Sequence, residues 1–310
     1  MSAAPNTVPR ISDLIDQTEL RALLARRNGP GLLFLAGHLL TLLLSGTLLA
    51  LSWGSAWVIP AVFLHGIVIV HLFAPYHECA HSTAFKSAWL NELICFGTGL
   101  VLLLTPLQFR WEHRAHHNYT QQAERDPQMI PMAERLGGYL YYATAIPYFY
   151  GAISTLVRHV LGRFSPMELQ FLPRAERPKV QRQAWLMWAI YLAIAVLSVA
   201  FESWNAVIYW LLPRVAGEPL MRLIRMSEHG GCPTVSNIWR NTRTVRTWPP
   251  IRWLAWNMAY HAEHHALAAV PFHALPRLHA LVGDRFEHVE QGYWRAQRSL
   301  IRNGWRNSHA

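Results

Sequence analysis

The length, composition and charge of the chain point to a membrane protein and exclude several other classes. The sequence has 310 residues, 52% of them hydrophobic, with 14 tryptophans and several long apolar runs, a combination typical of an integral membrane protein. Its 28 Lys and Arg against 18 Asp and Glu give a formal net charge of +10. Because most basic residues flank apolar runs, anionic lipid headgroups explain this charge better than a nucleic-acid partner. Three widely spaced cysteines without a CxxC pair predict free thiols and no disulfide framework.

The first two apolar runs predict a transmembrane hairpin. Residues 31–53 are nearly uncharged and long enough to cross about 30 Å of hydrocarbon at about 1.5 Å per residue. Arginines at 21, 26 and 27 precede this run, and a positive cluster at that place predicts a cytoplasmic N-terminus. The chain then returns through 56–75. We therefore expect the residues that follow 75 to emerge at the cytoplasmic surface.

Two further apolar segments, 89–107 and 138–157, are predicted to lie in the interface. If 89–107 crossed the bilayer once, the histidines at 113–117 would emerge on the opposite side from His77 and His81. This segment should therefore lie flat, or dip into the bilayer and return. The segment 138–157 contains five tyrosines and Pro147, which suit an interfacial position better than a span.

A second transmembrane hairpin is predicted at 184–200 and 204–220, and basic residues lie at both of its inner ends. The predicted fold is therefore an all-α integral membrane protein formed by the single domain 1–310. Four transmembrane helices in two hairpins carry a cytoplasmic helical cap, and both termini are cytoplasmic. We find no internal repeat and no low-complexity linker.

Three histidine clusters are the strongest motifs in the sequence. They read His77-Glu-Cys-Ala-His81, His113-Arg-Ala-His116-His117 and His261-Ala-Glu-His264-His265. Residues three and four apart share one face of an α-helix, so each cluster should direct its imidazoles to one side. A single tetrahedral metal needs four ligands, so eight histidines predict two ions. Neutral imidazole suits iron, zinc, copper and nickel, and ligand type alone does not choose among them.

These clusters resemble the histidine boxes of the membrane fatty acid desaturase and hydroxylase superfamily, whose pattern is HxxxH or HxxxxH, then HxxHH, then HxxHH. The resemblance covers about residues 56 to 280, including two predicted spans between the second and third boxes. It implies two non-haem Fe ions that activate O2 and remove hydrogen from an unactivated carbon. It also implies the following metal ligands: His77, His81, His113, His116, His117, His261, His264 and His265.

Two residues outside the boxes are added to the predicted site. The family often has one more ligand upstream of the last box, and His229, in a Glu-His-Gly sequence similar to that of bacterial desaturases, has a fitting position. Asn257 lies one helical turn before His261 and could hold a water molecule or bond a ligand. Acceptors for the outer ring N–H groups are expected among the nearby carboxylates of Glu78, Glu112, Asp126, Glu228 and Glu263.

Two other functions stay open on the residues alone. The first box also satisfies HExxH, the pattern of a zinc protease in which the Glu is a general base. That function would give no role to the other six clustered histidines. A haem-binding membrane protein could use His38, His65 and His71, which lie singly in apolar runs, as axial ligands. Each of these three is expected instead to be a hydrogen-bonded residue without a metal.

The predicted function is an O2-dependent lipid desaturase, with a lipid or carotenoid hydroxylase or ketolase as the alternative. An acyl-chain or other lipid substrate would reach the metals from the membrane. The sequence contains no His-Pro-Gly-Gly haem signature, cysteine-rich iron–sulfur pattern or GxGxxG loop, so an external donor such as ferredoxin, or cytochrome b5 with its reductase, should supply electrons. The predicted location is a bacterial inner membrane, with the histidine boxes on the cytoplasmic side.

Overall fold

The computed structural model describes residues 11–130 and 136–303 of the chain, and nearly all of its regular structure is helical. The helices of the first half are η1 (Ile11–Asp13), α1 (Gln17–Leu23), α2 (Asn28–Leu51), α3 (Val58–Val70), α4 (Phe73–Ala80), α5 (Ala88–Leu102), α6 (Pro106–Tyr119), α7 (Leu136–Ala143) and α8 (Ile146–Val160). Those of the second half are α9 (Pro166–Phe171), α10 (Arg177–Ala200), the π-helix η2 (Val207–Leu211), α11 (Leu212–His229), α12 (Pro249–Leu254), α13 (His261–Ala266), η3 (Phe272–Ala274), α14 (Leu275–Val282), η4 (Gly283–Arg285) and α15 (Tyr293–Asn303).

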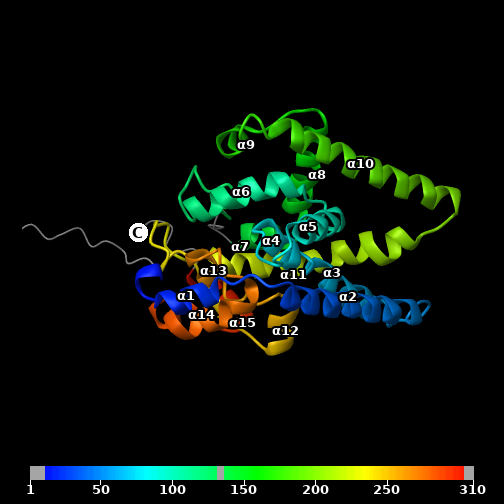
Figure 1. Ribbon diagram of the computed structural model, residues 1–310. Coiled ribbons are helices and arrows are strands. Elements are labelled where there is room, and N and C mark those ends of the chain that lie inside the picture. The colour runs from blue at the N-terminus through cyan, green and yellow to red at the C-terminus, as the bar shows by residue number, and fades with distance from the viewer. Residues whose placement is uncertain (1–10, 131–135, 304–310) are drawn as a thin grey trace, which may run out of the picture.

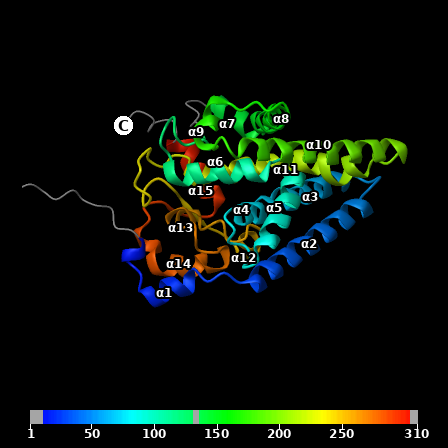
Figure 2. The ribbon, with the colours of Figure 1, turned by 45° about the horizontal axis from the view of Figure 1, so that its top comes forward.

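Within residues 11–130 and 136–303, three helical segments are long and apolar enough to cross a membrane, namely Gln17–Leu51, Val58–Ala80 and Arg177–Ala200. Large apolar side chains on α2 and α10 are exposed, such as Leu43 and Leu192 at 66% and 64%, as expected for helix faces that contact lipid. Figures 1 and 2 show α2 and α10 extending in the same direction, away from the part of the protein formed by α1, α13, α14 and α15. The prediction of a mostly helical membrane protein is confirmed.

The segment 89–107 belongs to a bent helix pair, and its predicted interfacial placement stays a prediction. The helices Ala88–Leu102 and Pro106–Tyr119 are together apolar enough to span, but they meet at an angle of 95°. Two residues explain the bend. Leu103 ends α5 in the left-handed conformation. Pro106 lacks a backbone donor and suits the first turn of a new helix. The bend returns α6 toward the end of α4, as the positions of the histidines require.

The fourth predicted span has a different character from the other three. Residues 204–220 form η2 and the first half of α11, and Arg214 and Glu218 are buried there at 2% and 1% exposure. This helix is not among those that meet the length and composition criteria for a span, because it carries these charged side chains. Its transmembrane placement stays a prediction, as does the assignment of residues 1–310 to one domain.

The described residues contain a small two-stranded sheet, which the all-helical prediction did not include. Strands β1 (Thr244–Arg246) and β2 (Val289–Gln291) pair in parallel, with Val245 opposite Glu290. Three residues per strand are too few to produce a readable alternation in the sequence. The pair ties the segment that follows α11 to the C-terminal helix α15. In the same region a core cluster joins the N-terminal Ile11, Ile15 and Leu23 to α14.

The membrane helix α3 packs closely against α11, the helix that ends at His229. A Cβ atom built on Gly66 would lie 2.2 Å from the carbonyl oxygen of Pro213, and one on Gly217 would lie 2.4 Å from the backbone of Gly66. The two helix backbones therefore touch, as small residues allow in membrane proteins.

We predict that Gly217→Ala destabilises the protein by about 1–3 kcal/mol, because the added methyl group can be accommodated only if the helices separate. The matched control is Gly97→Ala on α5, where a Cβ meets no atom within 4 Å and alanine favours the helix. Thermal unfolding in detergent should show a lower midpoint for the first variant alone. Equal midpoints would contradict the close packing.

Candidate metal centre

Four helical elements bring all nine predicted histidines together. α4 supplies His77 and, at its end, His81, while α6 supplies the second box, the last residue of α11 is His229, and α13 supplies the third box. Their rings form two groups, and within each group one ligand atom per residue lies within 4.8 Å of every other. The larger group contains His77, His81, His113, His117 and His264. The smaller group contains His116, His229, His261 and His265.

Each HxxHH box is divided between the two groups. On α6, His113 and His117 belong to the larger group and His116 to the smaller, whereas on α13 His261 and His265 belong to the smaller group and His264 to the larger. The helix period explains this, because residues i and i+4 differ by about 40° around the axis while i+3 and i+4 differ by about 100°. The expectation that each box points all its rings one way is thus too simple.

The ring nitrogens converge as metal donors do. The Nε2 atoms of His113 and His117 lie 3.0 Å apart, and those of His117 and His264 lie 3.1 Å apart. In the smaller group the Nε2 atoms of His229 and His261 are also separated by 3.1 Å. Two donors each about 2.1 Å from one ion are roughly 3.0–4.2 Å apart.

Burial keeps the histidine rings neutral and leaves several of their nitrogens without a hydrogen-bond partner. It lowers the pKa of His81 to about 3, and it lowers the pKa values of His229 and His264 well below 6.5, with further lowering from neighbouring charges. Among these nine histidines, the buried Nε2 atoms without a hydrogen-bond partner are those of His77, His81, His116 and His265. Because unpaired buried polar atoms are costly, and neutral imidazole is a good ligand, the residues present fit two metal ions.

Polar groups on nearby loops orient several of the rings. The Nδ1 atom of His116 lies 2.7 Å from a carboxylate oxygen of Asp126, and that of His113 lies 2.8 Å from the amide oxygen of Gln128. Such outer partners fix the tautomer and direction of a metal-binding ring. Thr120 lies 3.1 Å from Nδ1 of His265, and the carbonyl oxygen of Asn241 lies 3.3 Å from Nδ1 of His229.

Among the five carboxylates expected to serve as acceptors, the roles differ. Asp126 is the one that contacts the outer nitrogen of a box histidine within hydrogen-bond distance, whereas Glu263 contacts Thr244 and His279. Glu112 accepts from Gln108, and Glu228 pairs with Arg225. The sequence reasoning missed Gln128, Thr120 and Asn241. The polar segment after the second box, 120–128, was a usable signal for the first two.

We predict that Asp126→Asn weakens metal binding by about 10–100-fold, because the neutral amide orients His116 less strongly and can present an N–H to the ring. Asp126 also accepts from the backbone N–H of Gln121 at 2.9 Å, so loop ordering should decline as well. Glu124→Gln, an exposed change in the same loop, is the control. Metal titration of both variants measures the effect, and equal affinities would contradict it.

Asn257 is buried and donates to the carbonyl oxygen of Phe272 at 3.1 Å. Its predicted role beside a ligand stays a prediction. The single histidines expected to be hydrogen-bonded are so: His38 contacts the carbonyl oxygen of Val68 at 3.1 Å, and His65 contacts Ser45 at 2.7 Å. His71 contacts the carbonyl oxygen of Ile67 at 2.7 Å.

The first box is not arranged as an isolated HExxH site. His77 and His81 belong to the five-histidine group. The Glu78 carboxylate accepts from Thr83 at 2.8 Å and from the backbone N–H of Phe272 at 3.2 Å. A general base must reach a metal-activated water, whereas this carboxylate holds the loop around Phe272.

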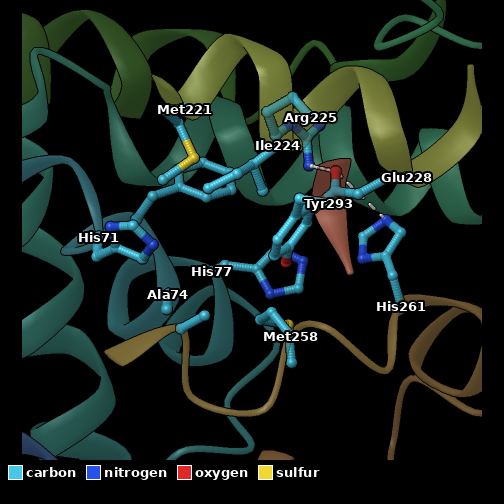
Figure 3. A pocket seen from close by; sticks show the side chains of 12 residues that line it. His71, Ala74, His77, Met221, Ile224, Arg225, Glu228, Met258, His261 and Tyr293 are labelled. Atoms are coloured by element: carbon cyan, nitrogen blue, oxygen red, sulfur yellow. Dashed lines mark hydrogen bonds and ion pairs between the residues drawn. The ribbon is translucent and has the colours of Figure 1, made fainter. Parts of the chain in front are cut away.

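A small cavity of about 30 Å³ borders both groups through His77 and His261. Apolar side chains of Phe73, Met221 and Met258 form part of its wall. Figure 3 shows Glu228 and Tyr293 at its polar end, near the two histidines. Apolar side chains therefore lie next to His77 and His261 at the metal centre.

Comparison with known proteins decides the family. A model of the fatty acid desaturase family matches residues 55–297. The chain belongs to this family. The desaturase-family relatives include the sphingolipid delta(4)-desaturase DES1 of Drosophila melanogaster, 24% identical over 253 residues, which covers 78% of this chain and 70% of that protein. The sn-1 oleoyl-lipid 12-desaturase of Picosynechococcus is 24% identical, over 73% of this chain and 69% of that protein.

A third relative is the human sphingolipid delta(4)-desaturase/C4-monooxygenase DES2, 23% identical over 78% of this chain and 70% of that protein. Family membership and the histidine groups together identify this chain as a desaturase-family di-iron oxidoreductase. The long apolar helices agree with its place as an integral membrane protein. The recognition of histidine-box desaturases in the sequence is confirmed.

Proposed function

We propose that this protein is an O2-dependent lipid desaturase that introduces a C=C bond into an acyl chain. The observation that carries the proposal is the pair of histidine groups, five and four rings, beside an apolar cavity. Two iron ions bound there would activate O2 and supply the oxidant that removes hydrogen. In the overall reaction O2, two electrons, two protons and two substrate hydrogens become two water molecules, and the substrate gains one double bond.

The roles of the residues follow from their positions. All nine histidines are proposed as ligands, with His77 and His261 nearest the substrate because they line the cavity. The apolar wall, including Met221 and Met258, would hold a methylene group and exclude water, since burial of hydrocarbon is favourable. Asp126 and Gln128 would keep the rings of the second box in their ligating orientation.

The orientation in the membrane, the electron donor, the substrate class and the cellular location are also proposed. Basic residues at 21, 26 and 27 precede the first span, which supports a cytoplasmic position for the termini and the metal centre. Reducing equivalents would come from an external donor such as ferredoxin or cytochrome b5 with its reductase. The relatives named as acyl-lipid and sphingolipid desaturases support a lipid substrate. A bacterial inner membrane stays the predicted location.

Hydroxylation is a second candidate, because DES2 carries both a desaturase and a monooxygenase name. The test combines metal analysis of the purified protein with mass spectrometry of lipids from expressing cells. We expect two irons per chain, no haem absorbance band, and a lipid product that has lost two hydrogens. A product that has gained one oxygen would replace desaturase by hydroxylase, and bound zinc without iron would overturn the proposal.

A further inference from the structure

Another cavity lies beside the segment that leads into the third box. It has a volume of about 470 Å³ and is bounded by the end of β1, by α12, by Tyr260 and by the end of β2 with Gly292. Its lining residues differ from those of the cavity beside the metal centre. Two of them are arginines, Arg246 and Arg252. The cavity is therefore a separate site, and its two guanidinium groups give it a positive charge.

No carboxylate neutralises these two arginines within the described residues. Neither takes part in the ion pairs found in that part of the chain. The sheet explains part of this, because Arg246 and Gln291 are paired in register and share one face, whereas Glu290 faces the opposite side. Arg252 instead donates to the hydroxyl of Tyr260 at 3.1 Å. A positive cavity without its own counter-ion is suited to an anion.

The cavity lies close to the level at which the first membrane helix enters its apolar run. In α12 the ring of Trp253 packs on Gly37, where a Cβ atom would lie 2.2 Å from the Cζ2 atom of that ring. The centroid of the same ring lies 5.9 Å from that of Phe34. Figures 1 and 2 show α12 beside the start of α2. Since the apolar run of α2 begins at residue 31, this contact puts α12 near the depth at which water gives way to hydrocarbon.

Exposed apolar side chains of the cavity agree with this position. Trp248 is 78% exposed and Ile251 is 40% exposed, and both line the cavity. Tryptophan is enriched at the boundary between membrane and water, where its ring contacts lipid and its N–H contacts water. The cavity thus combines cationic donors with apolar side chains, as an amphipathic ligand requires.

We propose that this cavity binds the phosphate group of an anionic membrane phospholipid, with Arg246 and Arg252 as the donors. A guanidinium group presents a planar pair of N–H donors that matches two phosphate oxygens. Trp248 and Ile251 would contact the apolar part of the same lipid, which a free phosphate ion lacks. The inference goes beyond the proposed reaction and depends on neither iron nor turnover.

The choice of an anionic headgroup follows from the lining of the cavity. A zwitterionic headgroup carries a cationic amine as well as a phosphate, and the described lining residues include no carboxylate to accept it. An aromatic ring is the other usual partner of a cationic amine. The ring of Tyr260 already has the guanidinium carbon of Arg252 at 5.9 Å from its centroid. The cavity therefore favours a phospholipid with net negative charge.

The experiment uses the full-length protein, delipidated in detergent, and measures lipid binding by mass spectrometry of the intact protein. Phosphatidylglycerol and phosphatidylcholine with identical acyl chains are titrated in turn. We expect phosphatidylglycerol to bind about tenfold more tightly, and Arg246→Gln to lower its affinity about tenfold or more. Arg252→Gln should show a similar loss. If that variant does not fold, Arg246→Gln decides the test, because Arg246 is exposed.

The matched control is Arg174→Gln, which removes the same charge from an exposed position between α9 and α10. In Figure 1 this position and α12 lie on opposite sides of the protein. We expect the control to bind phosphatidylglycerol as the wild type does. Equal losses in Arg246→Gln and Arg174→Gln would overturn the inference, because they would indicate attraction by net charge alone.

Two further results would also contradict the inference. One is equal affinity of the wild-type protein for the two lipids, or unchanged affinity in Arg246→Gln. The other comes from a competition with inorganic phosphate. If phosphate displaces phosphatidylglycerol at equal concentration, the site recognises a soluble phosphate compound and the lipid assignment is wrong. Retention of the lipid under those conditions is the expected result.

Discussion

Replacing one histidine of either group by alanine, His264→Ala in the larger or His116→Ala in the smaller, is expected to abolish turnover. Both rings are buried, at 0% and 1% exposure, and each lies among the converging donors of its group. Loss of an outer partner costs about 10–100-fold in affinity or activity, so loss of a donor should cost at least about a hundredfold. Lipid profiling measures activity, and elemental analysis measures bound iron.

The control is His38→Ala, because His38 is equally buried but contacts the carbonyl oxygen of Val68 and belongs to neither group. We expect this variant to keep its iron and its activity. The box variants should still insert into the membrane, because their helices keep the apolar faces that drive insertion. Full activity in both box variants would disprove the two-iron assignment, whereas iron loss in His38→Ala would revive the haem alternative.

The parts of the fold that could be predicted are those that depend on local composition and length. The apolar runs 31–53, 56–75 and 184–200 largely coincide with parts of the long helical segments Gln17–Leu51, Val58–Ala80 and Arg177–Ala200, because length and hydropathy suffice to predict a lipid-facing helix. The expectation that 89–107 does not cross the bilayer once came from a different argument, namely that His113 and His77 must reach one site. The structure places their ring centroids 4.5 Å apart.

The details that escaped prediction depend on contacts between distant segments. The positioning of His265 by Thr120 joins residues 145 positions apart, and no local spacing encodes that pair. The helix period separates His116 and His264 from the other rings of their boxes, but which rings of α6 and α13 join in one group depends on how the two helices lie across the site. Glu263 and Glu228 each lie next to a ligand in sequence, yet only Glu228 contacts a ring of the two groups.

The charged residues of α11 are a second case that the sequence did not reveal. The run 204–220 was predicted as an apolar span, yet it contains residues of a buried ion network. Glu218 is 1% exposed, pairs with Arg214, and lies 2.6 Å from Arg222. Arg214 also donates to the hydroxyl of Tyr148 at 2.9 Å. This tyrosine is on α8, so the network connects α11 to a helix far away in the sequence.

Glu218→Ala is therefore expected to destabilise the protein by about 3–5 kcal/mol, because it leaves Arg214 as a buried charge without its carboxylate. The control Glu287→Ala breaks an ion pair with Arg240 in which both side chains are about half exposed, and such pairs contribute about 1 kcal/mol or less. Thermal unfolding in detergent should separate the two variants clearly. Similar midpoints would contradict a structural role for the buried network.

The combined variant Glu218→Met with Arg214→Met tests the reason for that loss. A buried pair replaced as a whole by apolar side chains of similar size is often neutral or stabilising, and Arg222, at 12% side-chain exposure, is the less buried of the two arginines. We expect the double variant to recover most of the stability lost in Glu218→Ala. No recovery would mean that the lost stability does not come from the uncompensated charge of Arg214.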